Sequence, residues 1–211
     1  MNIKKDNILI VGAGNMGLAF LSALLDNKVN PKKIFILENN PSQKLKKINK
    51  TRKFNLINSI YKIDIKIKIG ITLLAIKPNH VAGIFNEQFN DLIKKSVIIS
   101  IVAGKTTATL KKLSNNNKNI ARAMTNTPVT VGWGTSVVYF TKTTTKTNKI
   151  KALNLLDLVG QVDEVKSEKY INSFTGLFGS GPAYLFLLLE IWTNLAKKHG
   201  FKHSEIGRAH V

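Results

Sequence analysis

The feature that most constrains this 211-residue sequence is a glycine-rich loop close to the N-terminus. An apolar run at residues 8–11 is followed by Gly-Ala-Gly-Asn-Met-Gly at positions 12–17, and residues 15–26 continue with helical spacing. In such a loop the first glycine allows a tight turn, the second lets the backbone approach a pyrophosphate, and the third lets the helix pack closely on the strand. The free N–H groups at the helix start attract phosphate. The pattern therefore predicts a strand, a turn and a helix that bind a dinucleotide.

The next expected strand, residues 34–37, ends directly before Glu38. An acidic side chain at this place accepts hydrogen bonds from the adenosine ribose and repels a 2′-phosphate, which favours NADH. Asn39, Asn40 and Lys44 follow, and these side chains are suited to hold a phosphate instead. The sequence leaves the choice between NADH and NADPH open, as it does the interpretation of Glu38 as a solvated strand end.

The first 166 residues alternate short β-branched runs with helical stretches, which is typical of a parallel sheet with crossover helices. Strands are expected over residues 8–11, 34–37, 72–76, 97–102, 119–123, 135–140 (an outer strand) and 162–165, helices over 15–26, 107–113 and 150–158, and a surface hairpin loop over 141–148. From residue 168 the chain is expected to be helical, interrupted by a glycine-rich turn at 176–181, after which Pro182 opens a second helix. The predicted fold class is α/β: a Rossmann-type dinucleotide-binding domain, residues 1–166, followed by the start of an all-α dimerisation domain, residues 167–204.

Composition argues against several other classes of protein. The formal net charge is +20, but the lysines are spread along the chain without an arginine-rich patch or an aromatic platform. We therefore expect a solvated basic surface and no nucleic-acid partner, with a polyanion-binding module as the alternative. The uninterrupted apolar runs are shorter than the ~20 residues of a membrane span, and no secretory signal is visible. Cysteine is absent and the histidines lack metal-ligand spacing, so we expect a cytoplasmic protein without a metal site.

Five segments, in the same order and at the same spacing, resemble pyrroline-5-carboxylate reductases. They are residues 10–17 (IVGAGNMG), 75–78 (AIKP), 100–104 (SIVAG), 122–128 (RAMTNTP) and 175–184 (TGLFGSGPAY). The last two are the most specific, because the glycine loop is shared with many dehydrogenases. Thr125 stands where the family usually has proline, Phe178 where it has serine, and Asn172 where an acidic residue is common.

The resemblance implies an NAD(P)H-dependent oxidoreductase of proline biosynthesis, which transfers a hydride to the C=N bond of 1-pyrroline-5-carboxylate and yields L-proline. It implies NADPH or NADH contacts from Gly12, Ala13, Gly14, Asn15, Met16, Gly17, Glu38, Asn39, Asn40, Ala75, Ile76, Lys77, Pro78, Ala103 and Gly104. It implies substrate contacts from Asn126, Thr127, Glu168 and Ser180, with Glu168 steadying the charged ring nitrogen. Glu168 as a plain charge at a helix N-terminus remains the simpler alternative.

In this family the proton donor lies in a later Ser-Pro-Gly-Gly-Thr-Thr segment, and the helical domain forms a homodimer or higher homo-oligomer. No such segment is visible here, so we expect the proton donor to lie outside this chain and the chain by itself to be inactive. Residues 183–199 form a helix that is apolar all round and needs cover from a partner subunit or from further sequence. Residues 205–211 read as a translated sequencing adapter, so we expect the native sequence to end near Ser204. Two alternatives stay open: a non-catalytic dinucleotide-binding fragment, and another Rossmann dehydrogenase of the hydroxyacid dehydrogenase type.

Overall fold

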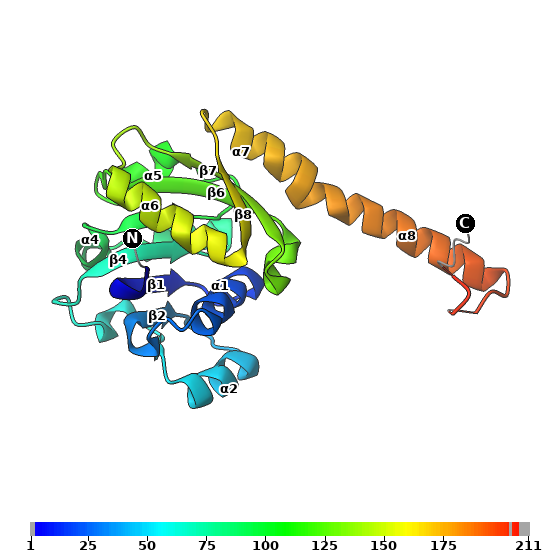
Figure 1. Ribbon diagram of the computed structural model, residues 1–211, viewed down its shortest axis with the longest axis horizontal. Helices are drawn as coiled ribbons and strands as arrows, with labels where there is room; N and C mark the ends of the chain where they lie inside the picture. Colours follow the sequence, from blue (N-terminus) through cyan, green and yellow to red (C-terminus); the bar gives the residue numbers. More distant parts are fainter. Residues whose placement is uncertain (1–2, 203, 207–211) are drawn as a thin grey trace.

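In the computed structural model, which describes residues 3–202 and 204–206, a folded α/β body carries one long projecting helix (Figure 1). The strands are β1 (Asn7–Val11), β2 (Ile34–Leu37), β3 (Asn55–Ile57), β4 (Ile69–Leu74), β5 (Val97–Ser100), β6 (Ile120–Thr125), β7 (Gly134–Phe140) and β8 (Gly160–Glu164). The α-helices are α1 (Asn15–Asp26), α2 (Gln43–Arg52), α3 (Val81–Ile84), α4 (Glu87–Ile93), α5 (Thr107–Leu113), α6 (Lys146–Leu156), α7 (Lys169–Phe174) and α8 (Gly181–Lys198). Short helical segments are η1 (Ile3–Lys5), η2 (Pro31–Lys33), η3 (Ile60–Lys62), η4 (Pro78–His80), η5 (Thr127–Val131), η6 (Asp157–Val159) and the π-helix η7 (Thr175–Ser180).

The described strands form one sheet in the order β3-β2-β1-β4-β5-β6-β7-β8. All neighbours run parallel except β6 and β7, which are antiparallel. The order runs outward from β1 in both directions, so β1 and β4 are central and buried. This arrangement confirms the predicted α/β class and its parallel Rossmann-type sheet.

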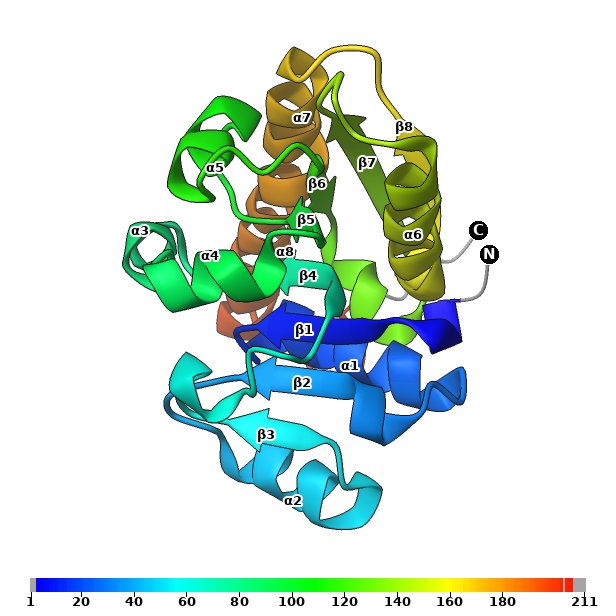
Figure 2. The ribbon, with the colours of Figure 1, turned by 90° about the vertical axis from the view of Figure 1, so that its left-hand side faces the viewer.

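The core lies on both faces of the sheet (Figure 2). Side chains of β1 alternate between the two faces: Ile8 and Ile10 pack with α1 and α6, whereas Leu9 and Val11 pack with the helices α3, α4 and α5. Phe20 on α1 is fully buried in the first of these layers. A strand covered on both faces has to be apolar at every position, which is why β1 appears in the sequence as an unbroken apolar run.

Hydrogen-bonding side chains set where several helices begin. Ser42, Asn86, Thr106 and Thr145 accept hydrogen bonds from backbone N–H groups in the first turns of α2, α4, α5 and α6, respectively. Such N-caps satisfy donors that the helix itself leaves free. The α1 helix differs, because its N-cap is Gly14 and no side chain caps it.

Two predictions around β7 are wrong. Residues 141–148 are not a hairpin loop, because α6 already begins at Lys146. The strands β7 and β8 run parallel, so a crossover helix has to join them, and α6 is that helix. The strand β7 is not an outer strand either, because β8 pairs with it and forms the edge of the sheet. The strand β3 and the helix α2 were not predicted, because α2 is rich in lysine and asparagine and buries only Leu45.

The expected interruption at residues 176–181 is also wrong. The chain is helical without a break from Lys169 to Lys198, through α7, η7 and α8. Gly181 takes ordinary right-handed helical angles, φ −50° and ψ −45°. The wider turn of a π-helix directly before Pro182 accommodates a residue that has no N–H to donate. The glycines therefore continue the helix, and the expected stop at Gly200 is found with φ +88°.

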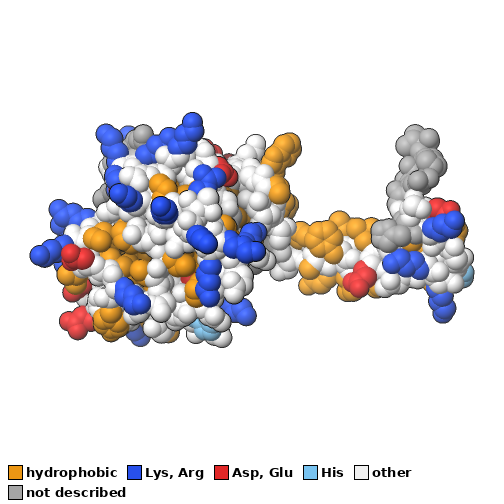
Figure 3. Space-filling view, turned by 90° about the horizontal axis from the view of Figure 1, so that it is seen from below, with side chains coloured by type: hydrophobic (Ala, Val, Ile, Leu, Met, Phe, Trp, Pro, Cys, Tyr) orange, Lys and Arg blue, Asp and Glu red, His pale blue; other side chains and the backbone are white. Residues whose placement is uncertain are grey.

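The projecting helix α8 is exposed over its apolar residues (Figure 3). Tyr184, Phe186, Leu187 and Trp192 each expose between 55% and 73% of their surface. By length and composition the 30-residue helix Lys169–Lys198 could cross a membrane, although an interior helix of a soluble protein has the same character. The length of uninterrupted apolar runs does not reveal this property of the helix, because Glu190 lies among its apolar residues. The expected read-through at 205–211 falls largely on residues 207–211, outside the described residues.

Candidate dinucleotide-binding site

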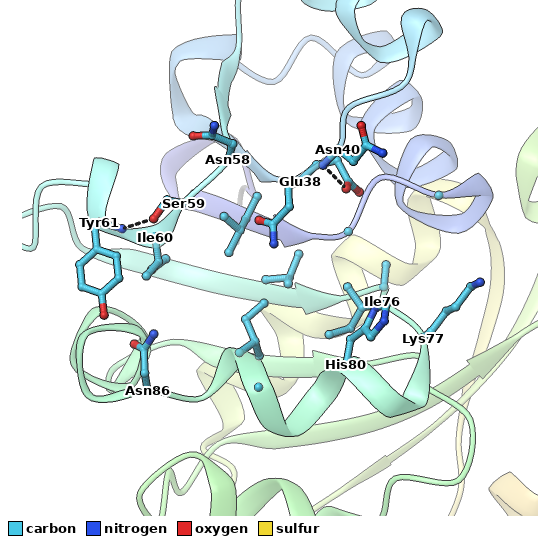
Figure 4. A pocket seen from close by; sticks show the side chains of 18 residues that line it. Glu38, Asn40, Asn58, Ser59, Ile60, Tyr61, Ile76, Lys77, His80 and Asn86 are labelled. Carbon is cyan, nitrogen blue, oxygen red and sulfur yellow. Dashed lines mark hydrogen bonds between the residues drawn. The ribbon is translucent and has the colours of Figure 1, made fainter.

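A pocket of about 680 Å³ lies at the carboxyl ends of β1, β2, β3 and β4 (Figure 4). Its lining is Val11, Gly12, Gly14, Leu37, Glu38, Asn39, Asn40, Asn58, Ser59, Ile60, Tyr61, Ala75, Ile76, Lys77, His80, Gly83, Ile84 and Asn86. The strand order reverses at β1, and ligands of open α/β sheets bind at such a point. The volume is within the range of small-molecule sites, roughly 300–1,000 Å³.

The glycine loop forms one wall of this pocket. Gly12 has φ +90°, and a Cβ there would lie 2.6 Å from the carbonyl oxygen of Ala75. Gly14 has no atom within 4 Å of the place where its Cβ would be, so a ligand can approach the backbone closely. Because no side chain caps α1, its first N–H groups are available to an anion. Gly12, Gly14 and the start of α1 therefore form a cradle that fits a pyrophosphate, as the sequence predicts.

Glu38 lies at the end of β2 beside this loop. Its Oε2 accepts a hydrogen bond of 2.9 Å from the backbone N–H of Ala13, and its Oε1 accepts one of 3.0 Å from the N–H of Asn40. The side chain is half-buried. The carboxylate is thus held in one place at the pocket wall, so the interpretation as a solvated strand end does not describe it.

The turn after β4 forms the opposite wall. The N–H of Ala75 donates to the carbonyl of Val11 at 2.8 Å, which holds this turn against β1. Ala75, Ile76 and Lys77 line the pocket, whereas Pro78 begins η4 behind them. Figure 4 shows Lys77 and His80 across the pocket from Glu38 and Asn40.

Some predicted cofactor contacts lie outside the pocket lining, and other lining residues were missed. Ala13, Asn15, Met16, Gly17, Pro78, Ala103 and Gly104 are not in the lining. Asn58, Ser59, Tyr61, His80, Gly83 and Asn86 line the pocket without having been predicted. Most of the missed residues follow β3 or belong to the helical turns after β4. Only the unrecognised strand at Asn55–Ile57 would have indicated the first group.

The remaining predicted residues of the sheet edge lie beside the pocket. Ala103 and Gly104 follow β5, and Gly104 has φ +72°. Asn126 follows β6, where its Oδ1 accepts a 2.8 Å hydrogen bond from the N–H of Thr135. Thr127 is the first residue of η5 and is exposed. Because β4, β5 and β6 run parallel, these residues continue the same edge of the sheet away from the pocket.

Glu168 belongs instead to a part-buried polar network. Its Oε1 and Oε2 accept hydrogen bonds from the N–H of Thr107 at 2.8 Å and from its hydroxyl at 2.7 Å. Glu168 also pairs with Arg122, Nη1 to Oε1 at 3.1 Å, and Nη2 of Arg122 donates to Asn172 at 2.8 Å. We call these four residues the Glu168 network. It joins β6, α5 and α7, and neither Glu168 nor the exposed Ser180 lines the pocket.

The side chain of Arg122 is buried, with only 3% of it exposed. Its Nε has no hydrogen-bond partner among the described residues. Asn172, at the position where the resemblance leads one to expect an acid, accepts from Nη2 as a neutral group. Glu168 is thus the carboxylate that balances this buried charge. Within the described residues, no group of three or more His, Asp or Glu side chains is arranged to hold a metal ion.

Comparison with known proteins agrees with this geometry. Residues 7–104 match the family described as NADP oxidoreductase, coenzyme F420-dependent. The chain is 31% identical to the pyrroline-5-carboxylate reductase of Haemophilus influenzae over 183 residues, which cover 87% of this chain and 66% of that protein. It is 30% identical to the pyrroline-5-carboxylate reductase of Vibrio alginolyticus over 195 residues, covering 92% and 70%.

Solved structures give the same result. The pyrroline-5-carboxylate reductase of Coxiella burnetii is 28% identical and superposes with a TM-score of 0.78, covering 93% of this chain and 72% of that one. The Plasmodium falciparum pyrroline carboxylate reductase with NADP bound shares the fold, with a TM-score of 0.78 at 22% identity over 95% of this chain and 72% of that one. The chain spans about two thirds to three quarters of the length of these relatives. The identity to these reductases agrees with the glycine loop and with the pocket where the strand order reverses. The chain therefore belongs to the pyrroline-5-carboxylate reductase family.

Proposed function

We propose that this protein is an NAD(P)H-dependent oxidoreductase that reduces 1-pyrroline-5-carboxylate to L-proline. The observation that carries the proposal is the glycine loop, whose Gly12 and Gly14 line a pocket of about 680 Å³ together with Glu38. Membership of the family identifies the reaction, and the glycine cradle provides a binding site for the cofactor of that reaction. Bound NAD(P)H supplies a hydride for the C=N bond of the substrate.

The residues of the chain have distinct parts in this proposal. Backbone N–H groups at the start of α1 bind the pyrophosphate, and Glu38 accepts from the adenosine ribose. The edge of the sheet continues from the pocket past Ala103 and Gly104 to Asn126, whose side-chain amide is available to orient the substrate. Holding the two reactants in one orientation at this edge contributes to the rate of such a transfer, because it replaces an encounter in solution by a reaction between already positioned groups.

Two further expectations belong to the same proposal. We assign residues 1–166 to the cofactor domain and residues 167–204 to the start of a helical domain. The exposed apolar residues of α8, among them Phe186 and Leu187, support self-association, because single-chain proteins rarely leave so large an apolar surface in water. We propose a cytoplasmic homo-oligomer with no nucleic-acid or membrane partner.

The test measures binding and turnover separately, since the chain spans only part of its relatives' length. Cofactor oxidation is followed with 1-pyrroline-5-carboxylate and with a panel of 2-keto acids, the substrates that a hydroxyacid dehydrogenase would reduce. Oxidation with the pyrroline alone supports the proposal, and oxidation with keto acids alone would contradict it. Tight dinucleotide binding without turnover on any substrate would fit both the inactivity of this chain by itself, which the resemblance implies, and the non-catalytic alternative.

A further inference from the structure

We infer that the pocket selects NADH over NADPH and that Glu38 sets this preference. The inference rests on the proposed function of the pocket as a dinucleotide site. Glu38 lies at the end of β2, where the adenosine ribose binds in folds of this kind. The two cofactors differ only at this end of the molecule, where NADPH carries a phosphate on the ribose 2′-oxygen.

The carboxylate of Glu38 is fixed in place. It accepts one backbone hydrogen bond on each oxygen, 2.9 Å from the N–H of Ala13 and 3.0 Å from the N–H of Asn40. Bonds to an ionised carboxylate are among the stronger hydrogen bonds in proteins, so the side chain does not swing aside at little cost. Each oxygen retains capacity to accept a further bond. A ribose hydroxyl can donate that bond, whereas a phosphate dianion cannot.

The pocket wall around Glu38 offers no cation to offset a phosphate. The other polar residues that line it at the ends of β2 and β3 are Asn39, Asn40, Asn58, Ser59 and Tyr61, all of them neutral. Lys44, which the sequence suggested as a phosphate partner, is not in the lining. Scarcity of cations does not explain this, because the chain has 32 Lys and Arg residues against 12 Asp and Glu.

The basic side chains of the lining lie on the far side of β1. Lys77 and His80 belong to the turn after β4, and the sheet order places β1 between β2 and β4 (Figure 4). They are therefore placed to meet the phosphates that bridge the two halves of the cofactor rather than a 2′-phosphate at the end of β2. A 2′-phosphate would face the fixed carboxylate of Glu38 and neutral amides, and like charges at close range repel.

The experiment compares ADP-ribose with 2′-phospho-ADP-ribose, and NADH with NADPH, by calorimetric titration of the purified chain. The first pair isolates the adenosine end, so its result does not depend on the nicotinamide or the substrate. We expect the ligand without the phosphate to bind at least about tenfold more tightly in each pair. In Glu38→Gln we expect this ratio to fall by roughly tenfold, because the charge is removed while the size is kept.

Glu164→Gln is the matched control. Glu164 lies on β8, the strand at the other edge of the sheet, where its carboxylate pairs with Lys149 of α6, so its loss should leave the ratio unchanged. Equal or tighter binding of the phosphorylated ligand to the unaltered chain would overturn the inference alone, and the measurement does not depend on how the variant folds. An unchanged ratio in a folded Glu38→Gln protein would remove Glu38 as its cause. Failure of all four ligands to bind would overturn the proposed function together with the preference.

Discussion

Replacing Glu168 by alanine should destabilise the protein far more than an ordinary surface substitution. Glu168 is 24% exposed, but its partner Arg122 is only 3% exposed and already has an unpartnered Nε. Without Glu168 a buried guanidinium keeps only its bond to Asn172 and loses its balancing charge. Breaking a buried ion pair costs about 3–5 kcal/mol. Because Glu168 is partly exposed, we expect Glu168→Ala to lower the free energy of unfolding by about 3 kcal/mol, the lower end of this range.

The measurement is equilibrium urea unfolding of Glu168→Ala beside Glu164→Ala. Glu164 also forms an ion pair, with Lys149, but the two side chains are 42% and 35% exposed. Exposed pairs contribute about 0–1 kcal/mol, so Glu164→Ala should shift the midpoint little. The slope of the unfolding free energy against urea concentration should be the same in both variants. A difference in midpoint then reports a difference in stability and not in the surface exposed on unfolding.

A second variant separates the buried charge from the loss of packing. The double replacement Arg122→Met with Glu168→Leu removes both charges and keeps similar volumes. Because a hydrophobic pair often substitutes for a buried ion pair at no net cost, we expect it to recover most of the stability lost in Glu168→Ala. Equal effects of Glu168→Ala and Glu164→Ala would refute the reasoning. Weaker binding of 1-pyrroline-5-carboxylate to Glu168→Ala without any loss of stability would instead support the substrate role that the resemblance implies.

Three other predictions concern the cradle and the projecting helix. Gly12→Ala should lower the free energy of unfolding by about 1–3 kcal/mol and weaken ADP-ribose binding. Gly12 has φ +90°, and the new Cβ would lie 2.6 Å from the carbonyl oxygen of Ala75. Urea unfolding and calorimetric titration measure the two effects, and an unchanged unfolding midpoint would contradict the first. Gly14→Val should weaken ADP-ribose binding by about tenfold or more but leave stability within about 0.5 kcal/mol, since its Cβ meets nothing within 4 Å in the protein; a destabilised protein with intact binding would contradict this. Leu187→Lys, at a position 55% exposed, should lower the sedimentation coefficient if α8 mediates self-association, and an associated Leu187→Lys protein would remove that surface from the interface.

The local elements were predictable where the pattern was strong. The bounds of α1 and α5 and of β2 coincide with those expected from the sequence, because each is short, apolar on its buried side and bounded by a turn or a cap. The glycine loop was predictable for a physical reason: the φ of +90° at Gly12 and the close approach at Ala75 exclude a side chain. The sequence could therefore predict the glycine loop, of which Gly12 and Gly14 line the pocket.

Elements with weak patterns were missed or misread. The helix α2 buries a single residue, Leu45, and so shows no apolar periodicity. The glycines of residues 176–181 were interpreted as a turn, although the same residues tolerate helical angles when the following chain continues the helix. Local sequence does not distinguish these cases, because the outcome depends on which backbone hydrogen bonds the neighbouring turns complete.

By itself, the sequence determined the family and the fold class and predicted the glycine loop, since each is recognised from patterns within short segments of the chain. Only the tertiary structure decided that Asn58 and Ser59 share a pocket with Gly12, and that Lys77 and Glu38 lie on different sides of it. It also decided that Glu168 balances Arg122, 46 residues earlier, at a site apart from the pocket. Such pairings follow from the order of the strands in the sheet, which sets distances that spacing along the chain does not encode.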